Sequence, residues 1–364
     1  MDRTAGFAAR PAKVRQAPRP RVWVSQPLFD DIVEQLAAHF ELTLEREVRS
    51  YSSDELAERL APLDGALVTL NERIGAAEIA SAGNLRAIAN VGVGYNNLDL
   101  EALSAAGIVA TNTPDVLTET TADFGFALLM ATARRITEAE AFLRQGRWRA
   151  WSFTTLLGAD LHGSTLGILG LGRIGRAIAR RARGFGMRVV YHNRSRLAPA
   201  LEAELGASWL GFDELLSASD HLMLVLPYTP ASHHLIDARA LARMKPTATL
   251  VNIARGGIVD ELALADALAH GRLAGAGLDV FEGEPKVRPE LLALKNLVLT
   301  PHIGSASLAT RRAMVQLAVD NLIAAMGVGP NAGHPPSILN ADALKAARTG
   351  AAVAGAKKTT ASKR

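Results

Sequence analysis

Short apolar runs alternate with amphipathic segments along two stretches of the chain. Within the first stretch, apolar residues recur at four-residue spacing in residues 27–40, which predicts a helix with Leu28, Ile32, Leu36 and Phe40 on one face. The strands predicted in the first stretch are residues 21–25, 41–44, 65–69, 85–89 and 108–111. Those of the second stretch begin at Thr165 and continue at 189–190, 222–226, 248–253, 277–280 and 297–300. This alternation predicts two doubly wound parallel sheets.

Two further segments predict helices that join these stretches. Residues 116–143 have the composition of one long and largely buried helix, and residues 307–326 have that of a helix returning to the first domain. The first domain is then discontinuous and comprises residues 21–119 and 304–340. Residues 120–303 form the second domain, and residues 1–20 and 341–364 lie outside both.

The second domain opens with an apolar strand, a glycine turn and a helix-prone segment. The turn is Gly170-Leu-Gly172-Arg173-Ile174-Gly175. Gly170 permits a tight turn, Gly172 allows backbone N–H groups to approach a pyrophosphate, and Gly175 allows the helix to pack closely on the strand. The helix N-terminus adds unpaired N–H donors and a partial positive charge. This combination predicts a dinucleotide site and a Rossmann cofactor domain.

The end of the next strand indicates which dinucleotide is bound. An NAD site usually carries an acidic residue there, whose carboxylate accepts a hydrogen bond from the ribose 2′-hydroxyl. This chain instead has Asn193, followed by Arg194, Ser195 and Arg196. The missing carboxylate removes repulsion against a 2′-phosphate, and the two arginines can pair with it. We therefore expect NADPH as the cofactor, with NADH as the alternative.

Three polar residues of the second domain each follow an apolar strand. Arg255 precedes two glycines, Glu284 lies in the segment Glu-Gly-Glu-Pro, and His302 lies in the segment Thr-Pro-His-Ile-Gly. The carboxyl ends of parallel strands form the edge where ligands bind in such sheets. Arginine can hold a carboxylate and polarise a carbonyl, whereas a histidine oriented by a carboxylate can donate a proton. The three residues therefore predict a catalytic set.

These motifs together resemble the D-2-hydroxyacid dehydrogenase family over residues 22–340, and most closely its glyoxylate/hydroxypyruvate reductases. The resemblance implies a Rossmann domain inserted into a flavodoxin-like, discontinuous substrate domain. It makes Arg255, Glu284 and His302 catalytic. It places Ile253, Asp279 and Gly304 near the nicotinamide and Pro227 along the cofactor. The substrate is expected to contact Val93, Gly94, Arg255, His302 and Trp151.

The resemblance implies hydride transfer from NADPH to the C2 carbonyl of small 2-oxo acids, giving D-2-hydroxy acids. Glyoxylate and hydroxypyruvate are the expected substrates. A 2-ketoaldonate reductase acting on 2-ketogluconate and a 3-phosphoglycerate dehydrogenase are the alternatives. Nucleotide-sensing corepressors share the fold, but the complete Arg/Glu/His set argues against that class. The family also implies a homodimer in which Trp151 reaches the neighbour's substrate pocket. Because Arg255 supplies the polarisation, no metal is expected in the reaction.

Charge and cysteine content refine this picture. Residues 1–21 and residues 341–364 each carry six basic side chains against one acidic side chain, so residues 22–340 have a net charge of −6. We expect the basic ends to be disordered tails and a nucleic-acid role to be improbable. The chain has no cysteine, which excludes disulfides and thiolate metal sites and agrees with a cytoplasmic location. No apolar stretch approaches the ~20 residues of a membrane span.

Overall fold

The computed structural model describes residues 18–346, and these residues divide into two compact units. The first unit contains residues 18–91, 97–112 and 315–346. The second contains residues 113–314 together with the short segment Gly92–Asn96. The domain joins expected from the sequence, after residues 119 and 303, both lie inside the second unit.

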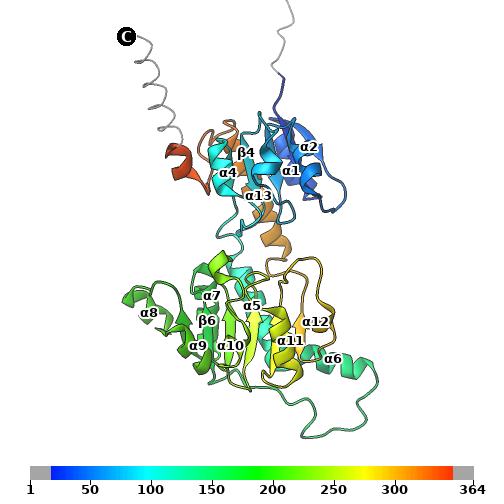
Figure 1. The fold of residues 1–364 in the computed structure, drawn as a ribbon, viewed down its shortest axis with the longest axis vertical. Coiled ribbons are helices and arrows are strands. Elements are labelled where there is room, and N and C mark those ends of the chain that lie inside the picture. The colour runs from blue at the N-terminus through cyan, green and yellow to red at the C-terminus, as the bar shows by residue number, and fades with distance from the viewer. Residues whose placement is uncertain (1–17, 347–364) are drawn as a thin grey trace, which may run out of the picture. The chain divides into compact units, whose positions relative to one another are not determined.

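The first unit contains the blue elements of Figure 1, and it is built on a five-stranded parallel sheet in the order β2-β1-β3-β4-β5. This is the flavodoxin-like strand order, as predicted. Its elements are β1 (Arg21–Val24), α1 (Asp30–Ala37), β2 (Glu41–Leu44), α2 (Ser53–Leu60), β3 (Gly65–Val68), α3 (Ala76–Ile79), β4 (Ala87–Asn90), α4 (Leu100–Ala105) and β5 (Val109–Thr111). Helix α13 (Leu308–Ala325) begins in the second unit and ends in this one.

Alternating side chains of β1 explain why helices cover both faces of this sheet. Val22 and Val24 belong to one buried cluster, which also contains Leu36 of α1 and Leu322 of α13. Trp23 points to the other face and belongs to a second cluster with residues of α2. Since every residue of β3 and β4 is buried, both faces of the sheet have to be covered.

The second unit is built on a seven-stranded parallel sheet in the order β12-β11-β10-β9-β6-β7-β8. Counted from β6, this is the doubly wound dinucleotide-binding order with one added strand, which confirms the predicted fold. Its strands are β6 (Thr165–Leu169), β7 (Arg188–His192), β8 (Ala207–Trp209), β9 (His221–Leu224), β10 (Thr249–Asn252), β11 (Gly275–Leu278) and β12 (Leu297–Leu299). Its helices after β6 are α7 (Arg173–Gly184), α8 (Pro199–Leu205), α9 (Phe212–Ala218), η1 (Pro230–Ser232), α10 (Ala238–Leu241), α11 (Glu261–Ala269) and α12 (Pro289–Leu292). Strand β8 was not expected from the sequence.

The segment expected to form one connecting helix forms two. Helix α5 (Thr118–Ala133) packs on α7, β10 and β11, whereas α6 (Ile136–Arg144) has no buried residue. The break falls at Arg135, whose backbone is left-handed at φ 54°. Its guanidinium contacts both carboxylate oxygens of Glu138 and the carbonyl of Leu157. The chain therefore leaves the sheet at Arg135, and the prediction of one buried helix over 116–143 is wrong.

The expected tails lie mostly outside the described residues, in 1–17 and 347–364. Where they are described, they are ordered. Arg19 donates a hydrogen bond to the carbonyl of Ala37, and residues 341–346 are helical with Leu344 buried. Residues 18–20 and 341–346, which the prediction assigns to the tails, thus include residues that contact the first unit, and the remainder of the predicted tails lies outside the described residues. No helix in residues 18–346 has the length and apolar character needed to cross a membrane.

Candidate active site

The glycine turn between β6 and α7 has the form that the motif predicts. Gly170 has φ +103°, and its N–H donates to the carbonyl of His192 at 3.0 Å. A Cβ at this position would lie 2.7 Å from the backbone nitrogen of Leu226, so only glycine fits. Gly172 is the N-cap of α7, has no side-chain cap, and has open space beside it. The twelve-residue helix α7 thus begins with uncapped N–H groups, a site suited to a pyrophosphate.

The segment after β7 is held against this turn. The Oδ1 atom of Asn193 accepts a hydrogen bond from the N–H of Leu171 at 2.7 Å. Arg196 binds Glu202 through Nε at 2.9 Å and Nη2 at 2.7 Å. Together with a hydrogen bond from Tyr191, Arg196 lowers the pKa of Glu202 to about 2. Arg196 therefore has only its Nη1 edge left for a further anion.

Two neighbours of Arg196 remain open to solvent. Arg194 and Ser195 are both exposed. Arg194 forms no hydrogen bond or ion pair with any other residue in the described part of the chain. Of the two arginines expected at the 2′-phosphate, Arg194 is therefore the one whose whole guanidinium is available.

Arg255 lies three residues beyond the end of β10, on a loop fixed by Asn252. The side chain of Asn252 donates to the carbonyl of Arg255 at 2.9 Å and accepts from the N–H of Ala254 at 3.0 Å. A Cβ on Gly256 would overlap the backbone of Phe281, so this loop packs directly on the loop after β11. Burial lowers the pKa of Arg255, and the charge of Glu284 opposes that effect. The Arg255 side chain is thus largely enclosed, on a loop that is itself fixed by Asn252 and by the loop after β11.

The segment Gly92–Asn96 meets the same guanidinium. A Cβ placed on Gly94 would overlap the Nη2 and Cζ atoms of Arg255. The backbone of Gly94 therefore lies directly against the arginine, and the side chain of Asn96 donates to the carbonyl of Tyr228 at 2.9 Å. The structure thus brings Gly94, one of the expected substrate residues, to Arg255.

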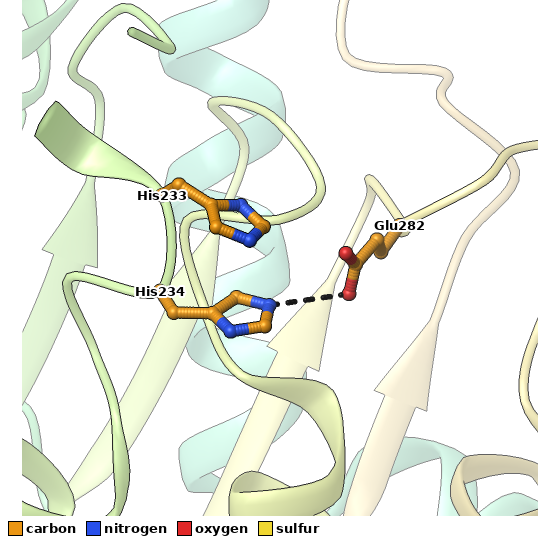
Figure 2. Close-up of side chains that lie close together, drawn as sticks. All are labelled: His233, His234 and Glu282. Atoms are coloured by element: carbon orange, nitrogen blue, oxygen red, sulfur yellow. Dashed lines mark hydrogen bonds and ion pairs between the residues drawn. The ribbon is translucent and has the colours of Figure 1, made fainter. Parts of the chain in front are cut away.

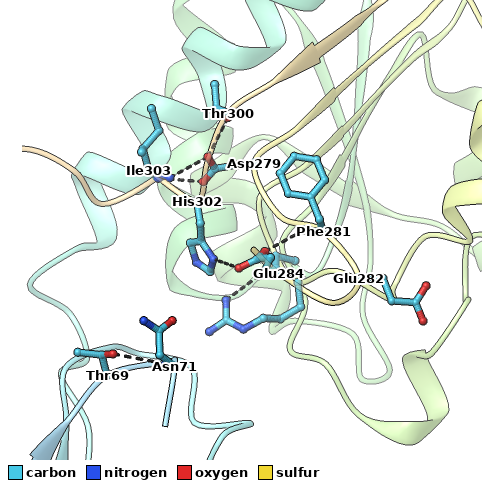
Figure 3. A network of polar contacts seen from close by, with 12 residues as sticks. Thr69, Asn71, Asp279, Phe281, Glu282, Glu284, Thr300, His302 and Ile303 are labelled. Carbon is cyan, nitrogen blue, oxygen red and sulfur yellow. Dashed lines mark hydrogen bonds and ion pairs between the residues drawn. The ribbon is translucent and has the colours of Figure 1, made fainter. Parts of the chain in front are cut away.

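His302 and Glu284 form a direct hydrogen bond. The Nδ1 atom of His302 lies 2.7 Å from Oε2 of Glu284, and the other carboxylate oxygen accepts from the N–H of Phe281 at 2.8 Å (Figure 3). Burial acts to raise the pKa of Glu284, but the hydrogen bond and charge of His302 outweigh it and the pKa is lowered. An ionised Glu284 fixes the tautomer of His302, which leaves Nε2 as the ring atom that can exchange a proton.

Asp279 holds the turn on which His302 lies (Figure 3). Its buried carboxylate accepts hydrogen bonds from the N–H groups of Ile303 and Gly304 and from the hydroxyl of Thr300, all at 2.8 Å. Burial raises the pKa of Asp279, against the effect of these donors. His302 itself has φ +52°, an unusual conformation for a residue with a side chain. Asp279 stabilises the strained turn.

The remaining expected site residues occupy different surroundings. Ile253 is buried beside Gly125 of α5, and Pro227 is exposed beyond the end of β9. Arg173 pairs with Asp115 at 2.8 Å. Trp151 lies on an exposed loop, where its ring contacts that of Phe153 at 4.5 Å. Within the described chain, Trp151 is therefore not brought to the catalytic set.

Sequence reasoning missed Asn252 and Glu261 as residues that organise this site. The first lies within the Asn-Ile-Ala-Arg motif, so its position was visible but its role was not. Glu261 is buried at the start of α11, and its Oε1 accepts from the N–H of Glu282 at 2.6 Å. Burial raises the pKa of Glu261. A lone acid at a helix start gives no sequence signal for this contact.

Comparisons with known proteins support the fold and identify the family. A family model described as "D-isomer specific 2-hydroxyacid dehydrogenase, NAD binding domain" matches residues 126–304. Glyoxylate reductase from Thermococcus onnurineus is 45% identical over 336 residues, covering 91% of this chain and 99% of the relative. Glyoxylate reductase from Pyrococcus furiosus is 44% identical, with coverages of 91% and 98%.

A solved structure shows the same fold. NADPH-dependent glyoxylate/hydroxypyruvate reductase from Sinorhizobium meliloti, in complex with NADP and malonate, is 37% identical with a TM-score of 0.77. The match covers 90% of this chain and 98% of that structure. Because the match extends over nine-tenths of the chain, it includes both units. The chain therefore belongs to the D-2-hydroxyacid dehydrogenase family.

Proposed function

We propose that this chain uses NADPH to reduce small 2-oxo acids, foremost glyoxylate and hydroxypyruvate, to the corresponding 2-hydroxy acids, with the D configuration where C2 is chiral. The observation that carries the proposal is the 2.7 Å hydrogen bond between Glu284 and His302 in the same unit as Arg255. The names of the glyoxylate reductases that the chain resembles support the choice of substrate.

Arg255 is the residue that recognises the substrate carboxylate in this proposal. Its guanidinium offers a planar fork of N–H donors, which matches a carboxylate bidentately. Since the backbone of Gly94 lies against that guanidinium, a carboxylate bound there also lies along the Val93–Gly94 segment. The remaining guanidinium N–H can point at the C2 carbonyl oxygen and stabilise the negative charge that develops on it.

His302 supplies the proton. With Nδ1 bound to Glu284, the imidazolium carries its second proton on Nε2, and this proton passes to the carbonyl oxygen as that oxygen becomes an alkoxide. Glu284 stabilises the charged ring before the transfer and receives no proton itself. The bound cofactor supplies the hydride that C2 accepts, so two electrons and two hydrogens convert the ketone or aldehyde to an alcohol.

The residues around the glycine turn fit a dinucleotide. The open side of Gly172, the uncapped start of α7 and the fixed Asn193 form a cradle that a pyrophosphate and a ribose would occupy. Arg194, Ser195 and the Nη1 edge of Arg196 would hold a 2′-phosphate. This arrangement supports NADPH over NADH.

Arg194→Ala should raise the KM for NADPH by about ten- to a hundredfold and leave the KM for NADH nearly unchanged. A hydrogen bond to a charged group contributes about 1.5–3 kcal/mol, and only NADPH has the 2′-phosphate that receives it. Steady-state kinetics with both cofactors measure the effect. Arg188→Ala is the matched control, because Arg188 is also exposed but lies at the opposite end of β7. An equal loss with both cofactors would contradict the role of Arg194.

The proposed reaction is tested by initial rates with glyoxylate and hydroxypyruvate, each with NADPH and NADH at matched concentrations. We expect faster oxidation of NADPH with both acids. A preference for NADH would keep the reaction and overturn the cofactor assignment. Absence of turnover with all four pairs, in a protein that binds NADPH, would overturn the substrate assignment.

We further propose that the chain forms a homodimer through α6 and the loop that follows it. Apolar side chains gather on this segment with large exposed fractions, 82% for Phe153, 69% for Trp151 and 63% for Leu157. Exposed apolar groups in one segment are typical of a protein–protein interface. Trp151 would then line the substrate pocket of the partner subunit.

Phe153→Glu combined with Leu157→Glu should convert the dimer to a monomer, because each charge would have to be buried without a partner. Sedimentation velocity should give twice the chain mass for the unaltered protein and the chain mass for this variant. Val48→Glu provides the control, since Val48 is 70% exposed in the first unit and should leave the mass unchanged. An unaltered protein that sediments as a monomer would rule out the proposal.

A further inference from the structure

His233, His234 and Glu282 converge on one point outside the catalytic set (Figure 2). The two histidines follow η1, and the glutamate lies in the loop after β11. One ligand atom from each residue lies within 4.8 Å of the other two. We propose that these three side chains form a binding site for a divalent transition-metal ion, and that the ion it takes is Zn²⁺.

The side chains have donor atoms to spare. His233 is exposed, and its Nδ1 lies 3.1 Å from the hydroxyl of Tyr228, which leaves Nε2 for a metal. The Nε2 atom of His234 points at Oε2 of Glu282 across 3.3 Å, which is long for such a hydrogen bond. Zinc binds imidazole nitrogen and carboxylate oxygen at about 2.0–2.2 Å. Rotation of the exposed His233 ring, which now stacks on His234 at 3.9 Å, would complete the closure around an ion.

The backbone under two of the ligands is fixed. His234 has φ +48°, a conformation that residues with side chains rarely adopt, and its N–H donates to the carbonyl of Gly257 at 2.7 Å. Such strain is often found at functional sites. The N–H of Glu282 donates to the buried carboxylate of Glu261. When ligand residues are already held by a second layer of contacts, they lose less conformational freedom on binding a metal ion.

The donor set selects the ion. Two imidazoles and one carboxylate suit Zn²⁺ and related transition metals, whereas Mg²⁺ and Ca²⁺ prefer oxygen ligands alone. Arg288 is the cation that competes for Glu282, with Nη2 at 3.7 Å from Oε2. The Nε atom of Arg288 also lies 3.4 Å from Oε2 of Glu261. A bound ion can therefore displace Arg288 from Glu282 while Arg288 keeps its shorter contact with Glu261. Three protein ligands leave the remaining position for water.

Titration calorimetry of the full, untagged chain with Zn²⁺ tests the site, at a pH above the ordinary imidazole pKa of about 6.5. We expect one equivalent to bind per chain and Mg²⁺ not to bind. His233→Ala and Glu282→Gln should each weaken Zn²⁺ binding at least about tenfold, the smallest loss seen when even an outer-layer partner is removed. X-ray absorption of the zinc-loaded protein should show two imidazole ligands.

His270→Ala is the matched control. His270 and Asp266 are another exposed histidine–carboxylate pair in the same unit, with Nδ1 of His270 at 2.9 Å from Oδ1 of Asp266. This pair contains one imidazole, whereas the proposed site contains two. This variant should bind Zn²⁺ as the unaltered chain does. Circular dichroism verifies that each variant is folded. Absence of zinc binding, or an equal loss in His270→Ala and His233→Ala, would overturn the site, and neither result bears on the reductase activity.

Discussion

Replacing His302 with alanine is expected to lower kcat with glyoxylate by about 10²- to 10⁴-fold, the usual contribution of a general acid. The imidazole is the proton donor of the proposed reaction, and alanine leaves only water to protonate the forming alkoxide. The binding of NADPH should persist, because the glycine turn and Arg194 lie on other loops. Steady-state kinetics measure the loss, and quenching of tryptophan fluorescence measures cofactor binding.

Two companion variants make this result specific. His334→Ala removes an exposed histidine of the first unit and should leave kcat unchanged. Glu284→Gln keeps a hydrogen-bonding group beside His302 but removes the carboxylate charge that lies against the ring. We therefore expect kcat to fall in Glu284→Gln, but by less than in His302→Ala. A kcat that survives in His302→Ala would assign the proton to another group.

Arg255→Lys is expected to lower kcat/KM by about 10²- to 10³-fold, although the charge is retained. Loss of one donor to a developing oxyanion typically has an effect of this size. Lysine cannot reproduce the planar fork that binds a carboxylate and a carbonyl oxygen together. We expect a higher KM, from the weaker hold on the carboxylate, and a lower kcat, from the weaker polarisation of C2. Kinetics with glyoxylate at saturating NADPH separate the two effects.

Arg239→Lys is the matched control for this change, because Arg239 is exposed on α10 and should tolerate lysine without loss. Arg255→Ala gives a second test. Added guanidinium ion can enter the space left by the side chain, so it should restore part of the activity of this variant and none in His302→Ala. Near-normal kcat/KM in Arg255→Lys would place the substrate carboxylate on a different residue.

Hydrophobic periodicity was sufficient to predict both parallel sheets, because the central strands β3, β4, β9 and β10 are mostly apolar and buried at every position. It failed where tertiary contacts decide the outcome. Strand β8 has only one buried residue, Ala207, so no apolar run marks it. The break between α5 and α6 depends on Arg135, whose left-handed backbone is stabilised by contacts with Glu138 and Leu157. The carbonyl of Leu157 lies 22 residues further along the chain, so helical periodicity around Arg135 gives no sign of it.

The site likewise contains residues that the sequence reveals and contacts that it does not. Arg255, Glu284 and His302 could be found because each follows a strand within a short motif. The contact of Gly94 with Arg255 and that of Glu261 with Glu282 connect segments far apart in the sequence, so no local pattern reveals them. The pairing of Arg196 with Glu202 is closer in sequence, but it depends on the orientation of α8.

The hydrogen bonds around Asp279 determine which part of the site is rigid. The N–H groups of His302, Ile303 and Gly304 all donate to this one residue, the first to its carbonyl and the other two to its carboxylate. These three amides should exchange their hydrogens with solvent as slowly as those of the neighbouring strands. The proposed proton donor, His302, then lies on an immobile extension of the sheet, and any motion that admits substrate has to occur in other segments.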